Sequence, residues 1–338
     1  MVDGFLNAAV LFANFVLVPG IAYGAQLALG ALGITLIFGI LRFGNFAHGD
    51  LMALGTAVTI LVTWWLQAHG VSLGPLPTAL LALPIGVAAA VAVALVSDRL
   101  VFRYYRVTRA TPVTFMIASV GVMFVLNGAV RFIIGVDDQN FADGTRFLIT
   151  ANGFREMTGL AEGLAIRSTQ VLTLIVAIVA VAALFWFLQK TVTGKAMRAF
   201  SDNENLARLS GIEPGVIVAY AWIIAATLAT LAGVLYGLDK SFKPFTYFQL
   251  LMPMFAAAIV GGIGQPVGAI VGGFLVAFSE VGLTYAYKKL LAYVVPDSWA
   301  SDGLIQLIAT DYKFSISFVI LVLTLLARPT GLFKGKVI

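Results

Sequence analysis

Long apolar runs alternate along the chain with short breaks that are polar or rich in glycine and proline. A helix needs roughly 20 apolar residues to cross a bilayer, so the long runs predict transmembrane helices. They share an apolar interior with a polar, glycine or proline break at each end, and they cover 46–68, 76–98, 112–134, 169–189, 216–238, 248–263, 266–285 and 314–327. The pattern predicts an all-α polytopic membrane protein, a bundle of about 8–10 transmembrane helices with broken or re-entrant segments.

The first apolar stretch, 5–41, is longer than one crossing requires and is interrupted by Pro19 and Gly20. Proline lacks a backbone donor and kinks or ends a helix. The stretch therefore forms either one span, with the N-terminus outside, or two segments, with the N-terminus inside. We favour two segments, or one span preceded by a partly inserted helix, which gives about nine or ten crossings in all.

The composition is that of a membrane protein rather than of a soluble domain. Of the 338 residues, 60% are hydrophobic and only 11% are charged, whereas about a quarter of a soluble domain is charged. The chain has no cysteine and only two histidines, His48 and His69, which excludes disulfides and cysteine-ligated metals. We expect membrane lipid around the chain, and no catalytic residue, metal, cofactor or nucleic-acid partner.

Lysine and arginine are concentrated in particular connections, and their placement sets the expected orientation. The basic segments are 98–111, 190–215 and the C-terminal tail after 327, whereas the acidic segment is 135–168. Short basic loops remain in the cytoplasm, so the C-terminus is expected there. Counting crossings between these segments then places 42–45 inside, and 239–247 and 286–313 outside.

Residues 42–50, RFGNFAHGD, place several polar side chains between two apolar runs. In one interpretation Asn45 caps the next helix, with His48 and Asp50 in its first turn, which a helix N-terminus favours. In the other, Asn45, His48 and Asp50 form a hydrogen-bonded cluster that supports a translocation pathway, because ionisable residues inside a membrane are functional candidates. The two interpretations are compatible.

Residues 261–273, GGIGQPVGAIVGG, space Gly264, Gly268 and Gly272 four residues apart. On a helix this spacing makes a stripe without side chains, which lets a neighbouring helix approach closely. The glycines and proline before it indicate a turn or a broken helix, so 248–285 forms two short limbs or a re-entrant hairpin. Irregular backbone at that depth requires protein or a water-filled cavity around it. Gly264 and Gly268 are therefore candidates either for the pathway or for plain helix packing.

The largest basic loop, 190–215, contains GKAMRAFSDNENLARLSGI. Ser201 or Asp202 could cap a short helix that runs to about Ser210, with Gly211 as its stop. Such a helix lies on the membrane surface or protrudes and fits a groove on a soluble partner.

Four stretches taken together carry a resemblance to a known family. They are NFAHGD (45–50), GKAMRAFSDNENLARLSGI (194–212), AAAIVGGIGQPVGAIVGG (256–273) and RPTGLF (328–333). In order and spacing they resemble the permease family of branched-chain amino-acid ABC importers, and within it the subunit with an NFAHG-type first motif. The resemblance implies a single transmembrane permease domain over 1–338 in a bacterial inner membrane. It also implies a second homologous permease subunit, two cytoplasmic ATP-binding subunits and a periplasmic substrate-binding protein.

The resemblance further implies that 201–211 is the coupling helix that docks on the ATP-binding subunits. The residues expected to take part are Asp202, Asn203, Glu204, Leu206, Ala207, Arg208 and Leu209. The expected cargo is a branched-chain or related amino acid. Some members of the family carry urea or short amides, which is the alternative.

A transporter driven by an ion gradient is the nearest rival. Such proteins use acids inside the membrane, and Glu280 is the main candidate; otherwise it is a partly hydrated group near a helix end. The sequence has no G-x-x-x-x-G-K-[ST] loop, so ATP hydrolysis is expected to belong to other subunits.

The segment 286–313 is longer than the resemblance leads us to expect. Its apolar and aromatic residues suggest an amphipathic element on the periplasmic face, and they are Leu290, Leu291, Trp299, Leu304 and Ile305. This insertion either touches the binding protein or is an embellishment of the fold.

Overall fold

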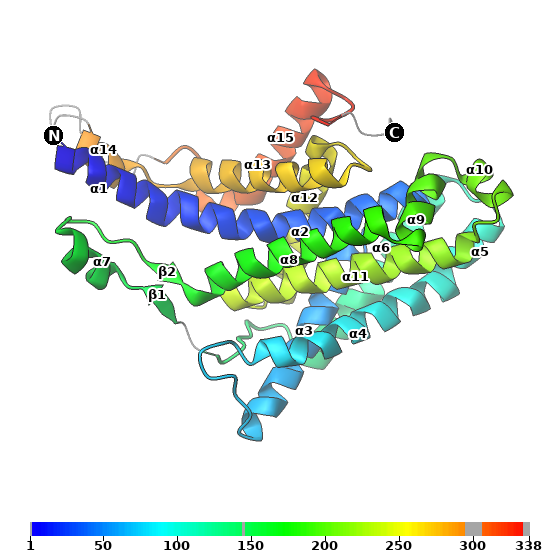
Figure 1. The fold of residues 1–338 in the computed structure, drawn as a ribbon, viewed down its shortest axis with the longest axis horizontal. Helices are drawn as coiled ribbons and strands as arrows, with labels where there is room; N and C mark the ends of the chain where they lie inside the picture. Colours follow the sequence, from blue (N-terminus) through cyan, green and yellow to red (C-terminus); the bar gives the residue numbers. More distant parts are fainter. Residues whose placement is uncertain (1, 144–145, 295–305, 334–338) are drawn as a thin grey trace.

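The computed structural model describes residues 2–143, 146–294 and 306–333, and it is a bundle of long helices (Figure 1). Within these residues, 8 helices are long and apolar enough to cross a membrane. Their bounds are Asp3–Leu41, His48–Ala68 (α3), Ala79–Val107, Pro112–Ile134 (α6), Ser168–Lys190 (α8), Pro214–Asp239 (α11), Pro244–Gly261 (α12) and Pro266–Thr284 (α13). A shorter apolar helix, α15 (Lys313–Ala327), follows them. The predicted all-α polytopic class is confirmed.

The first span is one uninterrupted helix, so the two segments that the sequence favoured are wrong. It consists of α1 (Val2–Phe12), a π-helical turn η1 (Ala13–Leu17) and α2 (Val18–Leu41). Pro19 lies in the first turn of α2, directly after the π-helical turn. A single π-helical turn can occur inside an α-helix without ending it, and here the helix continues past the proline. Its 39 residues extend about 58 Å, well beyond a hydrocarbon core of about 30 Å.

Helix α2 is the centre of the bundle. It packs against α13, α11, α12 and α8, and Figure 1 shows it running between α13 and α8. Nearly every side chain from Ala22 to Ile40 is buried, as expected for a helix that is apolar all round. Glycines allow this packing: a Cβ added to Gly24 would lie 3.2 Å from the Cα of Phe274 on α13.

Helices α12 and α13 form an antiparallel hairpin with direct backbone contact. A Cβ added to Gly268 would overlap the backbone of Gly261, and one added to Gly272 would overlap the carbonyl oxygen of Ala257. The predicted stripe is therefore present at Gly268 and Gly272. Gly264 does not belong to it, because it lies in the turn before α13 with a positive φ of 82°. Both helices are long enough to cross, which favours two spans over a re-entrant hairpin.

The third span is built from three consecutive pieces, α4 (Ala79–Ser97), a π-helical turn η2 (Asp98–Phe102) and α5 (Arg103–Val107). Arg106 and Asp98 form an ion pair across the π-helical turn at 2.5 Å. Asp98 also accepts a hydrogen bond from the indole of Trp222 on α11 at 2.7 Å. This end of the span is thereby fixed to α11.

Small elements mark the two ends of the bundle (Figure 1). One end, called here the lobe end, carries α7 (Ala151–Thr158) and α14 (Lys288–Val294) together with a two-stranded antiparallel sheet. The strands β1 (Phe147–Ile149) and β2 (Ile166–Arg167) pair Phe147 with Arg167. The opposite end, called the α10 end, carries α5, α9 (Val192–Asp202) and α10 (Glu204–Leu209). A 3-10 turn, η4 (Thr310–Tyr312), precedes α15.

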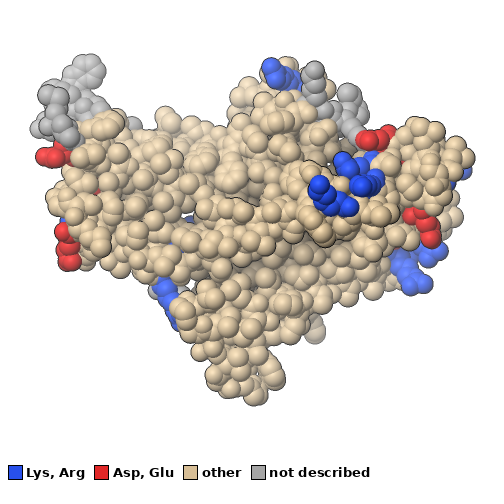
Figure 2. Space-filling model, viewed as in Figure 1, with Lys and Arg blue, Asp and Glu red and all other residues tan. Residues whose placement is uncertain are grey.

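Charged side chains follow this division. On the face in Figure 2, Lys, Arg, Asp and Glu gather toward the two ends and at the tip that carries α15, and the broad middle is uncharged. The basic segments 98–111 and 190–215 lie together at the α10 end, whereas β1, α7 and β2, within the acidic segment 135–168, lie at the lobe end (Figure 1). Large exposed apolar side chains between the ends include Phe124, Phe132, Ile178, Val322 and Leu326. A membrane or a partner subunit would cover such a surface.

Candidate functional site

Asn45 organises the turn that leads into α3. Its side-chain oxygen accepts a hydrogen bond from the backbone N–H of Ala47 at 3.1 Å, and its carbonyl accepts one from the N–H of His48 at 3.3 Å. The turn is also held by Ser119 of α6, whose hydroxyl accepts from the N–H of Phe46. The residue before α3 is Ala47, which makes no side-chain cap. The predicted capping role of Asn45 is therefore wrong in detail, because its side chain stabilises the preceding turn.

His48 and Asp50 attach the first turn of α3 to two different helices. The imidazole Nε2 of His48 lies 3.1 Å from the carbonyl oxygen of Gly30 on α2, and Gly33 leaves the room that the ring occupies, since a Cβ there would lie 2.6 Å from its Cε1. The carboxylate of Asp50 accepts a hydrogen bond from Asn127 on α6 at 2.6 Å. Both side chains are almost completely buried.

The three polar residues thus do not form the mutual cluster that the sequence suggested. No hydrogen bond joins Asn45, His48 and Asp50 to one another among the contacts of the described residues. Asn45 lies in the turn before α3, and His48 and Asp50 lie two positions apart in its first turn, so they point in different directions and contact different neighbours. The arrangement anchors the start of α3 inside the bundle.

Two hydrogen bonds connect the end of α9 to the end of α2. The guanidinium of Arg42 donates to the backbone carbonyl of Ser201, and the hydroxyl of Ser201 donates to the carbonyl of Gly39 at 2.9 Å. Arg42 ends α2 in a left-handed conformation with φ of 58°. Sequence reasoning missed this connection, because nothing in the chain signals that these distant positions meet.

The short helix in the basic loop is α10, and it is shorter than the predicted 201–211. Ser201 and Asp202 belong to the last turn of α9. The chain then bends at Asn203, whose side chain accepts a hydrogen bond from the N–H of Leu206 at 3.1 Å and so caps α10. The cap is therefore Asn203, not Ser201 or Asp202. Gly211, with φ of 83°, ends the helix as expected.

The outward face of α10 carries two exposed leucines. Leu206 is 61% exposed and Leu209 is 85% exposed, whereas Ala207 is buried against the bundle. Glu204 and Arg208 form an ion pair at 2.5 Å on the same short helix. Leucines three positions apart lie side by side on a helix, and an apolar pair of this kind is how a helix fits a groove on another protein.

Glu280 is completely buried, so the sequence-based interpretation as a partly hydrated group is wrong. Its carboxylate accepts hydrogen bonds from Tyr23 on α2, at 2.9 Å, and from Ser317 on α15. Lys313 at the start of α15 forms an ion pair with it at 3.8 Å and lies over the ring of Tyr23. A buried charge with this many partners joins three helices, and a coupling ion would have to displace those partners.

The described part of the predicted insertion 286–313 packs against the lobe end. Glu162 accepts hydrogen bonds from Lys289, at 2.9 Å, and from Tyr293, at 2.8 Å, both on α14. Burial alone raises the pKa of Glu162, but these hydrogen bonds and the charge of Lys289 lower it below its usual value. Trp299, Leu304 and Ile305, expected in the amphipathic element, lie outside the described residues; Leu290 and Leu291 are half-buried.

Comparisons with known proteins match nearly the whole chain to one family. The family model described as branched-chain amino acid transport system / permease component matches residues 16–325. The chain is 28% identical over 320 residues to the high-affinity branched-chain amino acid transport system permease protein LivH of Escherichia coli K12, covering 93% of this chain and 92% of LivH. It is 29% identical over 318 residues to the corresponding permease protein BraD of Pseudomonas aeruginosa, covering 94% of each.

A probable branched-chain amino acid transport permease of Methanocaldococcus jannaschii is 27% identical over 319 residues, covering 94% of this chain and 92% of that relative. Among solved structures, PsaBC from Streptococcus pneumoniae in complex with Fab aligns with 95% of this chain and 91% of its own, at a TM-score of 0.44 and 11% identity.

Proposed function

The chain belongs to the permease component family of branched-chain amino acid transport systems, and on this premise we propose that it is the membrane-spanning permease subunit of an ABC importer for branched-chain or related amino acids. The observation that carries the proposal is the match to such permeases over nearly the whole length of both chains. The exposed leucine pair of α10 supports it, because a permease of this kind requires a surface for its ATP-binding partners.

The proposal includes partners. Two ATP-binding subunits supply the energy, since the sequence lacks a phosphate-binding loop. We propose that the docking surface on this chain includes Leu206 and Leu209 of α10, which are both exposed. A second homologous permease subunit completes the pathway, and a periplasmic binding protein delivers the amino acid.

The orientation follows from charge. The segments 98–111 and 190–215 lie at the α10 end and are rich in Lys and Arg, so this end faces the cytoplasm. The last described residues lie near this end too. Leu332 and Phe333 donate backbone hydrogen bonds to the end of α12, and the turn after α12 lines a small pocket together with Ser201 and Asp202 of α9. The lobe end then faces the periplasm, in a bacterial inner membrane.

The contacts at the α10 end supply a route from the docking surface to the centre of the bundle. Movement of α10 pulls on the end of α9, and Ser201 is hydrogen-bonded to Arg42 and Gly39 at the end of α2. The turn after Arg42 leads from this end of α2 into α3, and His48 at the start of α3 contacts the carbonyl oxygen of Gly30 farther along α2. Closure of the ATP-binding subunits would therefore act directly on the two helices that hold the core.

Purification of the tagged chain from its native membrane tests the proposal. We expect a second permease and ATP-binding subunits to co-purify, and the complex to take up leucine in proteoliposomes when ATP and the binding protein are supplied. Unlabelled urea and short amides serve as competitors that distinguish the alternative cargo. Recovery of the chain alone, active without ATP-binding subunits, contradicts the proposal.

A further inference from the structure

A pocket of about 480 Å³ opens at the lobe end, a volume typical of small-molecule sites, which span about 300–1,000 Å³. It lies between the connection before α4, residues 140–143 and Arg146, the start of α8 and the end of α11. Its lining combines apolar and charged side chains. The apolar ones include Pro77, Phe141 and Leu238, and the charged ones are Asp143, Arg146, Arg167, Asp239 and Lys240.

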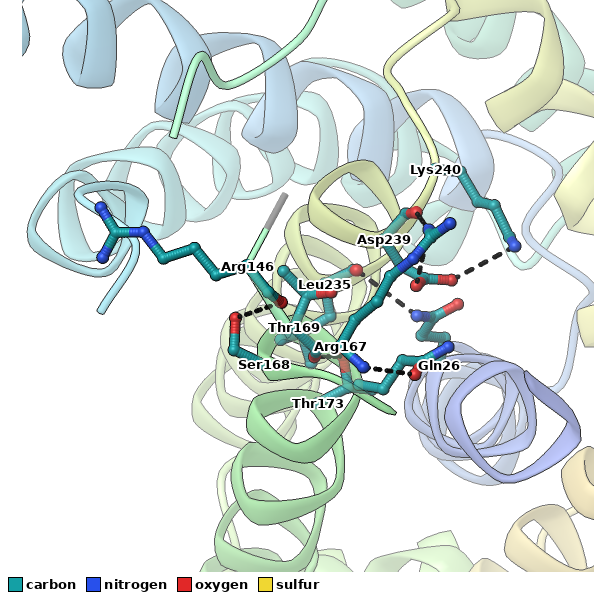
Figure 3. A network of polar contacts seen from close by, with 10 residues as sticks. Gln26, Arg146, Arg167, Ser168, Thr169, Thr173, Leu235, Asp239 and Lys240 are labelled. Atoms are coloured by element: carbon teal, nitrogen blue, oxygen red, sulfur yellow. Dashed lines mark hydrogen bonds and ion pairs between the residues drawn. The ribbon is translucent and has the colours of Figure 1, made fainter. Parts of the chain in front are cut away.

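One of the two acidic residues in the pocket lining is buried and incompletely paired. Asp239, the last residue of α11, has a side chain that is only 3% exposed, and its Oδ1 accepts no hydrogen bond within the described chain. The nearest cationic groups form only long ion pairs with this carboxylate. The guanidinium of Arg167 lies 3.9 Å from Oδ1, and the ammonium of Lys240 lies 3.4 Å from Oδ2. Figure 3 shows these three side chains turned toward one another. A buried carboxylate without a close donor is costly, so the position suits a cationic ligand group.

Gln26 of α2 is buried near the end of α11 and does not line the pocket. Its amide nitrogen donates to the carbonyl of Leu235, one turn before Asp239 on α11, at 3.4 Å. Its amide oxygen is buried and has no partner among the described residues. The contact holds α2 against the part of α11 that ends at Asp239.

The basic side of the same pocket suits a carboxylate. Arg167 directly precedes α8, its guanidinium is partly exposed, and it donates to the backbone carbonyl of Asp239 at 3.2 Å. The backbone of Arg146 is held beside the start of α8, because its carbonyl accepts from Ser168. Its guanidinium is turned away from Arg167 and Asp239 (Figure 3) and donates to the carbonyl of Gly74. The partly exposed guanidinium of Arg167 therefore provides the cationic group beside Asp239, and a guanidinium at the N-terminus of a long helix favours a bound anion.

We propose that this pocket binds a zwitterionic aliphatic amino acid. The carboxylate faces Arg167, the ammonium faces Asp239, and the aliphatic side chain lies against Phe141 and Leu238. The inference rests on the proposed function, since the lobe end is where an amino acid released by the binding protein first meets this subunit. An acidic side chain of the binding protein would pair with Arg167 but would bring no cation for Asp239.

A single reporter cysteine tests the pocket, because the natural chain has none. Asn140→Cys places a thiol on the lining at a position whose side chain makes no hydrogen bond among those of the described residues; only its carbonyl is used, by Trp64. In the reconstituted complex, leucine at ten times its Kd should slow labelling by an impermeant maleimide about tenfold, by mass action. Met157→Cys, on α7 and 86% exposed, is the matched control and should be unaffected.

Two analogues distinguish a zwitterion site from a plain anion site. 4-Methylpentanoate lacks the ammonium group and 3-methylbutylamine lacks the carboxylate, so each should protect Asn140→Cys at least about tenfold less well than leucine, because each loses one charged contact. When Asp239→Asn is added to Asn140→Cys, protection by leucine should weaken by a similar factor, whereas protection by 4-methylpentanoate should stay the same. Asp138→Asn, an exposed acid that pairs with Lys243 outside the pocket lining, is its control and should leave protection by leucine unchanged.

The outcomes separate this inference from the proposed function. Protection by 4-methylpentanoate equal to that by leucine overturns the zwitterion site. Equal protection by the ligand-free binding protein overturns it too, because the pocket would then be a docking surface. If the complex takes up leucine with ATP but leucine gives no protection, the pocket assignment fails and the proposed function stands. If leucine protects Asn140→Cys but the complex shows no ATP-dependent uptake, the pocket assignment stands and the proposed function fails.

Discussion

Arg42 at the end of α2 donates a hydrogen bond to the carbonyl of Ser201 in the last turn of α9. This bond spans 159 positions of the chain and joins the segment before α10 to the most central helix of the bundle. The hydroxyl of Ser201 adds a second bond, to Gly39. In the proposed importer these contacts lie between the docking surface and the pathway.

Replacing Arg42 should weaken coupling more than folding. In Arg42→Gln the exposed hydrogen bond to Ser201 is lost, worth about 1 kcal/mol or roughly fivefold in an equilibrium. We expect leucine transported per ATP hydrolysed to fall by about that factor while ATP hydrolysis continues. Lys195→Ala, exposed on α9, is the control. An unchanged transport-to-hydrolysis ratio in Arg42→Gln would contradict the role of this contact.

The two leucines of α10 should matter for transport and not for the fold. Leu206→Ala with Leu209→Ala removes side chains that are already exposed, and such changes alter stability by only about 0.5 kcal/mol. Each leucine buried at an interface contributes roughly 1.5–3 kcal/mol, so uptake should fall more than about tenfold. Val192→Ala on α9, also 85% exposed, should transport normally. Normal uptake by the double variant would show that α10 does not dock.

The buried ion pair of Glu280 should act as a structural anchor. Glu280→Gln leaves Lys313 without its partner charge, and breaking a buried pair costs about 3–5 kcal/mol. The thermal midpoint of the purified complex should fall, and adding Lys313→Met should restore much of it. A gradient-driven transporter predicts the opposite, namely that Glu280→Gln keeps its stability and loses dependence on an ion gradient.

Attachment of α14 to the lobe end should depend on pH. The lowered pKa of Glu162 means that its ionised form stabilises the folded state. This contribution is present above the unfolded value, about 4.3, and is lost as the pH falls through the folded value. The thermal midpoint should therefore drop on acidification below about pH 4.3, by less in Glu162→Gln, which lacks the titrating group. Identical acid profiles for the two proteins would show that this contact contributes nothing.

The contact between α12 and α13 should tolerate no side chain at Gly272. In Gly272→Ala the new Cβ overlaps the carbonyl oxygen of Ala257, and overpacking of this kind costs about 1–3 kcal/mol. Gly282→Ala on the same helix has room, with the nearest atom, the hydroxyl of Tyr287, 3.8 Å away. Thermal unfolding should separate the two variants, with only the first destabilised. Equal stability would mean that the hairpin is looser than described.

The sequence located the spans well, because an apolar run of membrane length has few alternative structures. It misjudged the first span, since Pro19 usually ends a helix and the π-helical turn that absorbs it has no sequence signature. The four-residue spacing predicted that Gly264 lies on a helix, because spacing alone does not show where the turn ends and the helix begins. Its polar composition and the glycine after it predicted the approximate position of α10, but they did not predict that Asn203 caps it.

The contacts that assemble the candidate sites were beyond the sequence. Tyr23, Glu280 and Lys313 lie in separate helices and meet only through packing. The same holds for Arg167 and Asp239. A single chain gives each residue type and its local surroundings, whereas the partner of a buried charge is decided by tertiary structure.

The central claim is that this chain provides the membrane pathway while separate subunits supply the energy. The most direct test compares leucine accumulation in proteoliposomes that contain the complete complex with accumulation in those that contain this chain alone. The account predicts accumulation against a gradient only with the complex and ATP. Accumulation by the chain alone, driven by an ion gradient without nucleotide, would contradict it.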